Sequence, residues 1–161
     1  MTGSFAAPSG PAQESPDQPG WAAASVTVRT PATSANLGPG FDALGLALGL
    51  HDEVEARVTG SGLRIEVSGV GEPTARLGDR HLVVRAMRAA FDAIGEQPPG
   101  LALRCVNAIP HGFGLGSSAA AIVAGLLAAR ALAGARGAGL SDAAVLRLAA
   151  GLEGHADNVA A

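Results

Sequence analysis

Hydrophobic and polar residues alternate in several short runs in the first part of the chain. The runs Ser25-Val26-Thr27-Val28-Arg29 and Leu63-Arg64-Ile65-Glu66-Val67 have the period of two that is typical of a half-buried strand, and both contain β-branched residues. Residues 30–42 are mostly small, polar or turn-forming and therefore predict a loop. We expect strands over residues 25–29, 43–50, 53–58, 63–67 and 101–109.

Farther along the chain, hydrophobic residues recur at helical spacing. A helix is expected to run from an N-cap at Asp79 to Ile94 and to end at Gly95. One face of it is apolar and should be buried: Leu82, Val83, Ala86, Met87, Ala90, Phe91 and Ile94. Residues 117–132 are apolar nearly all round and predict a buried helix. A last helix, 142–152, is expected to be capped by Ser141 and to turn three residues inward: Val145, Leu146 and Leu148.

The order of these elements predicts the fold class. Strands come first and helices later without strict alternation, which favours an α+β domain with helices packed on one face of a mixed or antiparallel sheet. Residues 1–24 lack periodicity and are rich in Ala, Pro, Ser and Gly, so they predict a disordered tail in front of one domain, residues 25–161. Trp21, in that tail, is expected to be solvent-exposed or loosely docked.

Composition excludes several classes of function. The eleven basic residues are all Arg, and without a Lys the chain can form neither a Walker-A loop, nor a protein-kinase site, nor a Schiff base. The net charge of -3 gives no basic surface for nucleic acid. No segment reads as a signal peptide or a membrane span, so the cytoplasm is the expected location. Cys105 lies within an apolar strand and is expected to be a buried, inert thiol.

A glycine-rich loop, residues 110–116, joins the last predicted strand to the apolar helix. Glycines let a backbone approach an anion closely, and the N-terminal end of a helix offers free N–H groups and a favourable dipole. The loop is followed by Ser117 and Ser118, whose hydroxyls can cap the helix or face a metal ion. Strand, glycine-rich loop and helix together predict a phosphate-binding site.

Polar residues that could carry chemistry gather in two further stretches. Asn36 and Asp42 lie in the predicted loop after the first strand, where both could also be ordinary turn residues. At the end of the chain stands the segment Glu153-Gly154-His155-Ala156-Asp157-Asn158. There His155 and Asp157 could form a structural hydrogen-bonded pair. Glu153 could be solvated at a helix end, although a carboxylate at that end opposes the helix dipole.

Three stretches together resemble homoserine kinases of the GHMP kinase superfamily. They are Pro31 to Gly45, Pro110 to Ala120 and Glu153 to Ala160, and the resemblance extends from Val26 to Ala161. It implies a GHMP kinase N-terminal domain of the ribosomal S5 domain 2-like type. The implied reaction is ATP-dependent phosphorylation of the side-chain hydroxyl of L-homoserine, on the route to threonine.

The resemblance also implies a role for each matching residue. Ser118 and Glu153 would bind Mg²⁺. Asn36, Asp42, His155 and Asn158 would bind L-homoserine, with Asp42 and Asn158 at the reacting groups. Asn158 stands where some relatives have a carboxylate base, so positioning and charge stabilisation would carry catalysis. ATP would contact Pro110, His111, Gly112, Phe113, Gly114, Leu115, Gly116, Ser117, Ser118, Ala119 and Ala120.

The chain also departs from the family pattern in two respects. Phe113 occupies a loop position where relatives more often carry a small, polar or basic residue. The family is about twice as long as this chain, so the C-terminal domain is absent from it, and we expect weak nucleotide binding with little or no kinase activity from these 161 residues. The resemblance leaves a homodimer open. The alternatives are another GHMP-type small-molecule kinase and an inactive nucleotide-binding remnant.

Overall fold

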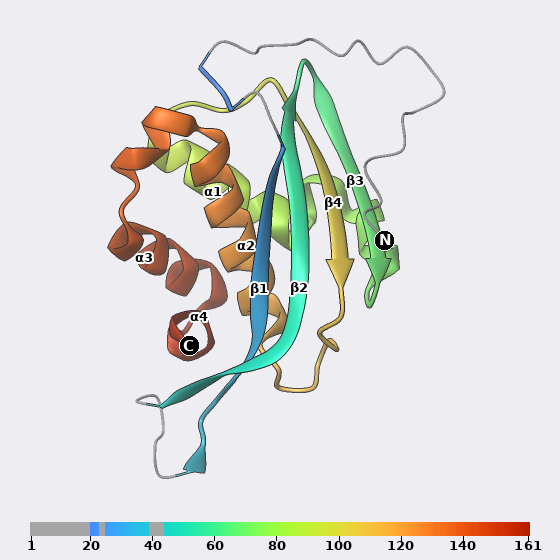
Figure 1. Cartoon of the computed structure of the whole chain (residues 1–161), viewed down its shortest axis with the longest axis vertical. Helices are drawn as coiled ribbons and strands as arrows, with labels where there is room; N and C mark the ends of the chain where they lie inside the picture. Colours follow the sequence, from blue (N-terminus) through green and yellow to red (C-terminus); the bar gives the residue numbers. More distant parts are fainter. Residues whose placement is uncertain (1–19, 23–24, 39–43) are drawn as a thin grey trace.

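The computed structural model describes residues 20–22, 25–38 and 44–161, and within them helices cover one face of a four-stranded sheet (Figure 1). The strands are β1 (Val26–Ala35), β2 (Gly45–Thr59), β3 (Gly62–Gly69) and β4 (Gly100–Asn107). The α-helices are α1 (Leu82–Ile94), α2 (Ser117–Leu132), α3 (Asp142–Glu153) and α4 (Asp157–Ala160). The described residues also contain the 3-10 helices η2 (Glu72–Arg80) and η3 (Gly134–Gly139).

The sheet has the strand order β1-β2-β4-β3. β1 pairs antiparallel with β2, β2 pairs antiparallel with β4, and β3 runs parallel to β4. Parallel neighbours need a long crossover, and η2 with α1 supplies it between β3 and β4. The predicted α+β class with a mixed sheet is confirmed.

The first strand is longer than the sequence indicated. A loop was expected from residue 30 onward, but β1 continues to Ala35 and pairs with β2 as far as Gly45. The register of this pairing shifts between Pro31 and Thr33, and β1 lies at the edge of the sheet. An edge strand tolerates a proline at such an irregularity because the missing N–H need not serve an inner ladder. The strand therefore accommodates residues that are usually found in turns.

The two strands expected over residues 43–50 and 53–58 are one continuous strand, β2. Its first half pairs with the end of β1, and its second half pairs with both β1 and β4. Pairing with β1 carries the backbone through His51 and Asp52 without a turn. Leu46 and Leu50 in the first half of β2, and Leu44 just before it, are exposed by 51%, 37% and 57%, so this part of the strand leaves apolar side chains at the surface.

The core lies between the sheet and helices α1 and α2. Its largest fully buried side chains include Phe91 and Met87 of α1, Leu101 and Leu103 of β4, and Leu126 of α2. The two helices approach closely at Gly125, where an added Cβ would lie 2.5 Å from the carbonyl oxygen of Val83. The predicted apolar face of α1 is confirmed in its main part, since Val83, Ala86, Met87, Ala90 and Phe91 are all buried.

Two helix boundaries were predicted well and one was not. Helix α2 has the expected bounds, and Ser141 caps α3 by accepting a hydrogen bond from the Ala144 N–H. Helix α1 begins two residues later than expected, because Asp79 belongs to η2 and the N-cap is His81. His81 has φ -60° and ψ 131°, an extended conformation, so the backbone does not run helically from Asp79 into α1.

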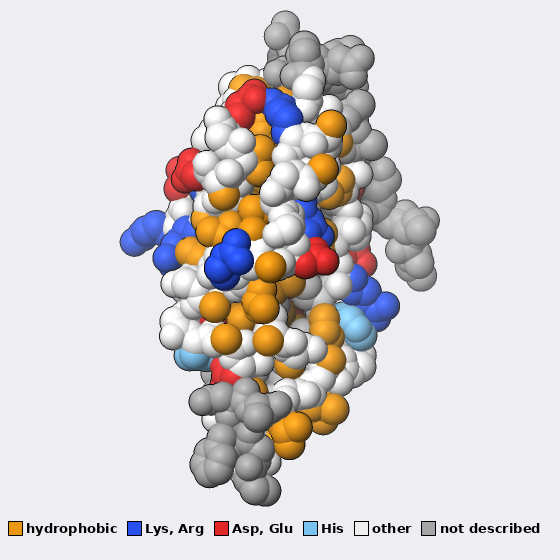
Figure 2. Space-filling model, turned by 90° about the vertical axis from the view of Figure 1, so that its left-hand side faces the viewer, with side chains coloured by type: hydrophobic (Ala, Val, Ile, Leu, Met, Phe, Trp, Pro, Cys, Tyr) orange, Lys and Arg blue, Asp and Glu red, His pale blue; other side chains and the backbone are white. Residues whose placement is uncertain are grey.

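Two single-residue expectations also changed. Leu146 of α3 was expected to point inward but is 42% exposed, whereas Val145 beside it is buried; Figure 2 shows hydrophobic side chains reaching the surface on this side of the molecule. Trp21 is docked more firmly than expected. Its ring makes an edge-to-face contact with Phe91 at 5.3 Å between centroids, and the guanidinium of Arg136 lies 4.4 Å from its centre.

Candidate active site

The glycine-rich loop leaves β4 and leads directly into the first turn of α2. The N-terminal N–H groups of any helix lack partners within the helix. In α2 no side chain caps them, and no acidic residue stands in the first turn. Gly112, Gly114 and Gly116 all adopt positive φ, between 65° and 79°. The loop thus has the open backbone that the sequence predicted for a phosphate site.

Gly116 brings the loop against the end of β1. A Cβ at this position would lie 2.1 Å from Oγ1 of Thr33, and its φ of +65° already disfavours other residues. The Thr33 N–H donates to the carbonyl oxygen of Leu115 at 3.0 Å. The exit of the loop is therefore held by the first strand, which the sequence had assigned to a loop at this point.

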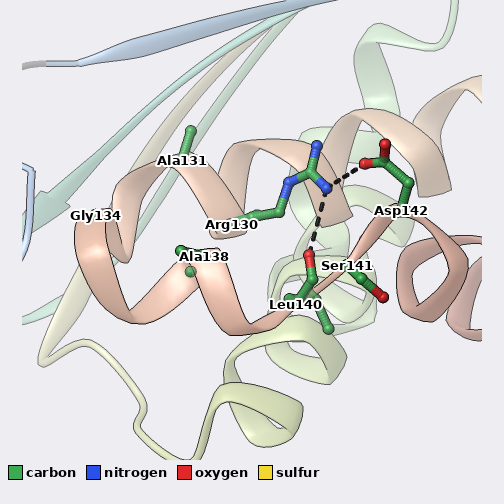
Figure 3. Close-up of a pocket in the computed structure, with 8 residues that line it drawn as sticks. Arg130, Ala131, Gly134, Ala138, Leu140, Ser141 and Asp142 are labelled. Carbon is green, nitrogen blue, oxygen red and sulfur yellow. Dashed lines mark hydrogen bonds and ion pairs between the residues drawn. The ribbon is translucent and has the colours of Figure 1, made fainter.

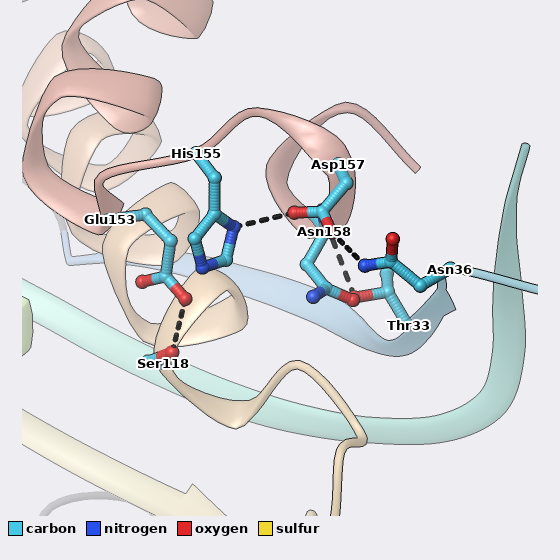
Figure 4. Close-up of polar contacts among 7 residues, drawn as sticks. All are labelled: Thr33, Asn36, Ser118, Glu153, His155, Asp157 and Asn158. Atoms are coloured by element: carbon cyan, nitrogen blue, oxygen red, sulfur yellow. Dashed lines mark hydrogen bonds and ion pairs between the residues drawn. The ribbon is translucent and has the colours of Figure 1, made fainter. Parts of the chain in front are cut away.

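Ser118 and Glu153 meet although 35 residues separate them. The Ser118 hydroxyl donates to Oε1 of Glu153 at 2.5 Å (Figure 4). Glu153 is the last residue of α3, where its own helix dipole is unfavourable to a negative charge, but it faces the N-terminal end of α2, where the dipole is favourable. The two residues predicted as metal ligands are thus adjacent, and both offer oxygen atoms.

Asp157 contacts Asn36, just after β1, and His155 and Asn158 of the C-terminal segment. Its Oδ2 accepts a hydrogen bond from Asn36 Nδ2 at 2.7 Å, and its Oδ1 accepts the Asn158 N–H at 2.9 Å. Nδ1 of His155 lies 2.5 Å from the same Oδ1. Because a carboxylate only accepts, Nδ1 donates here and Nε2 is the ring nitrogen left for other contacts. Asn36, His155 and Asn158 were predicted to share a substrate site, and Asp157 brings them together.

The protonation of Asp157 follows from these contacts. The Asn158 N–H chiefly, and then His155 and Asn36, hold the pKa of this carboxyl below its usual value of 3.8. Its side chain is only 6% exposed, whereas that of His155 is 58% exposed. Asp157 is therefore an anion at neutral pH and fixes the orientation of a largely accessible imidazole.

Thr33 closes the network against the glycine-rich loop. Its hydroxyl lies 3.2 Å from the carbonyl oxygen and 3.1 Å from Oδ1 of Asn158, and it can donate to either. Asn36 next to it has a φ of 57°, a left-handed conformation that asparagine tolerates and that turns the chain out of β1. The site thus has three walls: the end of β1, the start of α2, and the segment that follows α3 (Figure 4).

Three other residues predicted for the site lie outside the Asp157 network or outside the described residues. Asp42 lies outside the described residues. Phe113 is 77% exposed, at the outer part of the glycine-rich loop. His111 lies against Gly71, where an added Cβ would be 2.4 Å from its Cε1, so its ring faces the turn that follows β3. Thr33 was not singled out from the sequence, whereas the hydrogen-bonded pair of His155 and Asp157 was one of the interpretations considered there and is confirmed.

The opposite end of α2 carries a polar cluster of a different kind. A surface hollow there is lined by Arg130, Ser141 and Asp142 among others (Figure 3). Arg130 Nη1 donates to Asp142 Oδ1 at 2.6 Å and to the Leu140 carbonyl oxygen at 3.3 Å. At 1.5 Å per residue, Arg130 lies roughly 18 Å along the helix from Ser118. We assign this cluster to holding α2 against α3.

The described residues hold no group of three or more His, Cys, Asp or Glu side chains placed to bind a metal ion. Among them, no helix is both long and apolar enough to cross a membrane.

Comparison with known proteins supplies the family. Residues 81–161 match the family of GHMP kinases N terminal domains. The chain belongs to this family. A homoserine kinase from Streptomyces coelicolor is 60% identical to it over 143 residues, which are 89% of this chain and 46% of the relative. One from Corynebacterium diphtheriae is 56% identical over 136 residues, or 84% of this chain and 43% of the relative.

Solved structures of GHMP kinases agree with this assignment. The crystal structure of homoserine kinase from Cytophaga hutchinsonii matches with a TM-score of 0.69 and 32% identity, over 84% of this chain and 45% of that one. A mevalonate kinase from Methanococcus jannaschii has a TM-score of 0.63 at 19% identity, over 84% of this chain and 50% of that one, and so shares the fold. The chain spans about half the length of the curated GHMP kinases that it matches.

Proposed function

We propose that this chain is the nucleotide-binding half of a homoserine kinase, which transfers a phosphoryl group from ATP to the side-chain hydroxyl of L-homoserine. The observation that carries the proposal is the meeting of Ser118 and Glu153 at the open N-terminal end of α2. The network of Asn36, His155 and Asn158 lies beside it, on the same side of the sheet. The 60% identity to a homoserine kinase supports this choice of substrate.

The backbone would bind the phosphates of ATP. Residues 112–116 supply N–H groups at three positions of positive φ, and α2 adds its first-turn amides and its dipole. This chain has no lysine, and we assign the phosphate charge to the backbone amides and a metal ion. This fits a backbone loop of the GHMP type rather than a Walker-A loop.

Ser118 and Glu153 are a donor set that suits Mg²⁺. Magnesium prefers oxygen ligands and usually takes one or two from the protein, the rest coming from phosphate and water. A hydroxyl and a carboxylate oxygen 2.5 Å apart offer these two ligands. Bound there, Mg²⁺ would neutralise charge that develops on the transferred phosphoryl group.

The other residues would position L-homoserine. Asp157 holds the imidazole of His155 and the amide of Asn36, while Thr33 holds Asn158. Asn158 cannot accept a proton, so we assign to these residues the orientation of the substrate hydroxyl rather than its deprotonation. A loose phosphoryl-transfer transition state requires little more from the protein than alignment and charge stabilisation. The product, O-phospho-L-homoserine, would lie on the route to threonine.

The test is an assay of ADP release by the complete gene product with Mg-ATP. We expect release that depends on L-homoserine and not on mevalonate, a substrate of other GHMP kinases. Turnover with mevalonate instead would point to a different member of the superfamily. ATP binding without turnover of either compound would remove the catalytic assignment and leave a nucleotide-binding domain.

A further inference from the structure

Asp52 is a buried carboxylate in the middle of β2. The residue is 5% exposed and stands in the strand near the buried Val54 and Ala56. It faces Thr30 across the β1–β2 pair, yet the Thr30 hydroxyl is buried and has no hydrogen-bond partner among the described residues. A buried charge is costly unless hydrogen bonds compensate it. The hydrogen-bond donors to Asp52 therefore show which part of the fold its carboxylate stabilises.

Those partners are the last two backbone amides before Pro110 at the start of the glycine-rich loop. Oδ1 of Asp52 accepts the Ala108 N–H at 2.7 Å and the Ile109 N–H at 2.9 Å. The backbone pairing of β2 with β4 has already stopped, because its last pair at this end is Glu53 with Val106. A side chain of β2 thus continues the ladder where the backbone of β2 no longer does.

The next residues carry this anchorage into the loop. The side chain of Ile109 is fully buried and packs with Ala32 of β1 and Ala120 in the first turn of α2. Pro110, which follows, has a fixed φ and no N–H to donate. The loop is therefore held at its entry by Asp52 and at its exit by the contact of Thr33 with Leu115 and Gly116.

We propose that Asp52 is a positioning residue, which sets the direction of the glycine-rich loop through the amides of Ala108 and Ile109 and thereby governs affinity for the nucleotide phosphates. Hydrogen bonds to an ionised acceptor are about twice as strong as neutral ones. An apolar residue at this position would suit the core and leave both amides unpaired. This inference rests on the phosphate-binding role of the loop in the proposed function.

The experiment measures Mg-ATP binding to the 161-residue chain and its variants by NMR titration. Asp52→Asn keeps the shape and an acceptor oxygen but loses the charge, and we expect it to weaken binding about fivefold or more. Asp52→Ala should weaken it further, so that the asparagine variant counts as a partial rescue. The matched control is Glu53→Gln, which removes the same charge from the adjacent, exposed position and should bind like the unchanged chain.

A second readout separates positioning from general stability. Urea unfolding of each variant shows the conditions under which it is folded, and affinities are compared only there. A purely structural role for Asp52 would lower the unfolding free energy and leave the affinity of the folded protein unchanged. That result, or an equal loss in Glu53→Gln, would overturn the inference while the proposed function stands. An unchanged chain that binds no Mg-ATP would overturn the phosphate-binding role of the loop, on which the inference rests, whereas turnover by the complete gene product remains the test of the proposed function.

If Asp52→Asn does not fold, amide hydrogen exchange in the unchanged chain, with and without Mg-ATP, tests the proposal instead. If the loop is set through these amides, Mg-ATP should slow exchange at Ala108 and Ile109 more than at Leu103, in the middle of β4. Equal effects at the three amides would contradict the proposal.

Discussion

The two ends of α2 both carry polar side chains, but they differ in what those side chains contact. At the C-terminal end, Arg130 is satisfied by Asp142 and the Leu140 carbonyl, and Ser141 is satisfied by the amide that it caps. At the N-terminal end no side chain caps the helix, and a glycine-rich backbone stands open beside a serine and a carboxylate.

We propose that this difference separates a structural cluster from a ligand-binding one. At the C-terminal end, the hydrogen bonds of Arg130 and Ser141 stabilise the junction of α2 with α3. Uncapped amides at a helix start have unused hydrogen-bonding capacity and a favourable dipole for an anion. A surface hollow is present at the C-terminal end, so the presence of a hollow says less about function than the state of the surrounding donors and acceptors.

The strongest test of the comparison is the close contact at Gly116. Gly116→Ala should lower the unfolding free energy by about 3 kcal/mol, because the new Cβ combines a positive φ with a clash against Thr33. Gly114→Ala is the matched control. It has a similar φ of +70° with nothing within 4 Å and should cost only about 1 kcal/mol. Urea unfolding measures both, and equal losses would mean that Gly116 does not make this contact.

The next test compares the two serines at helix starts. In the complete gene product, Ser118→Ala should lower kcat/KM for Mg-ATP by about 100-fold and leave stability nearly unchanged, since Ser118 is exposed. Ser141→Ala should do the opposite and cost about 1 kcal/mol of stability as a lost N-cap, with full activity. Steady-state kinetics and urea unfolding of both variants give the result, and a large activity loss in Ser141→Ala would break the distinction.

A smaller effect is expected from the ion pair at the C-terminal end. Asp142→Asn should lower the unfolding free energy by about 0.5 kcal/mol, because the Asp142 side chain is 94% exposed and solvent screens its attraction to Arg130. Nucleotide affinity should not change. Thermal unfolding with and without Mg-ATP tests this, and a reduced shift on adding nucleotide would show that the two ends are coupled.

The smallest effect is expected from Asp157, as a change in the pH dependence of stability at acidic pH. Its pKa is lowered in the folded chain, so its contribution to stability is fully present above the unfolded value of 3.8 and is lost as the pH falls through the lower folded pKa. The unfolding free energy of Asp157→Asn should therefore be lower than that of the unchanged chain at pH 5. This difference should shrink below about pH 4, and urea midpoints across the range would show whether it does.

The sequence pattern predicted the structure correctly where the determining interactions act between residues close in sequence. The bounds of α2, the cap at Ser141 and the buried face of α1 all follow from apolar spacing and capping chemistry, which act within a few residues. Burial of Cys105 within β4 was predicted in the same way. Burial, helped by the charge of Asp52, raises the pKa of its thiol to about 12, which agrees with an inert cysteine.

The sequence pattern failed where strand pairing or helix packing with distant segments determines the local structure. Residues 30–35 have the composition of a loop, but β2 is available as a partner and makes them a strand. Leu146 fits an apolar spacing, yet the orientation of α3 leaves it at the surface. Asp52 gave no signal in sequence at all, because its partners lie 56 and 57 residues away.

The sequence by itself determined the α+β class, the helix that begins at Ser117, and the residue types of a phosphate site, since these depend on composition and on spacing within single elements. Only the tertiary structure brought Ser118 to Glu153 and Asn36 to Asp157, contacts that span 35 and 121 residues. Such contacts arise when packing of the sheet and helices places distant chain segments together. The residue types determine the chemistry of these contacts, and the fold determines their geometry.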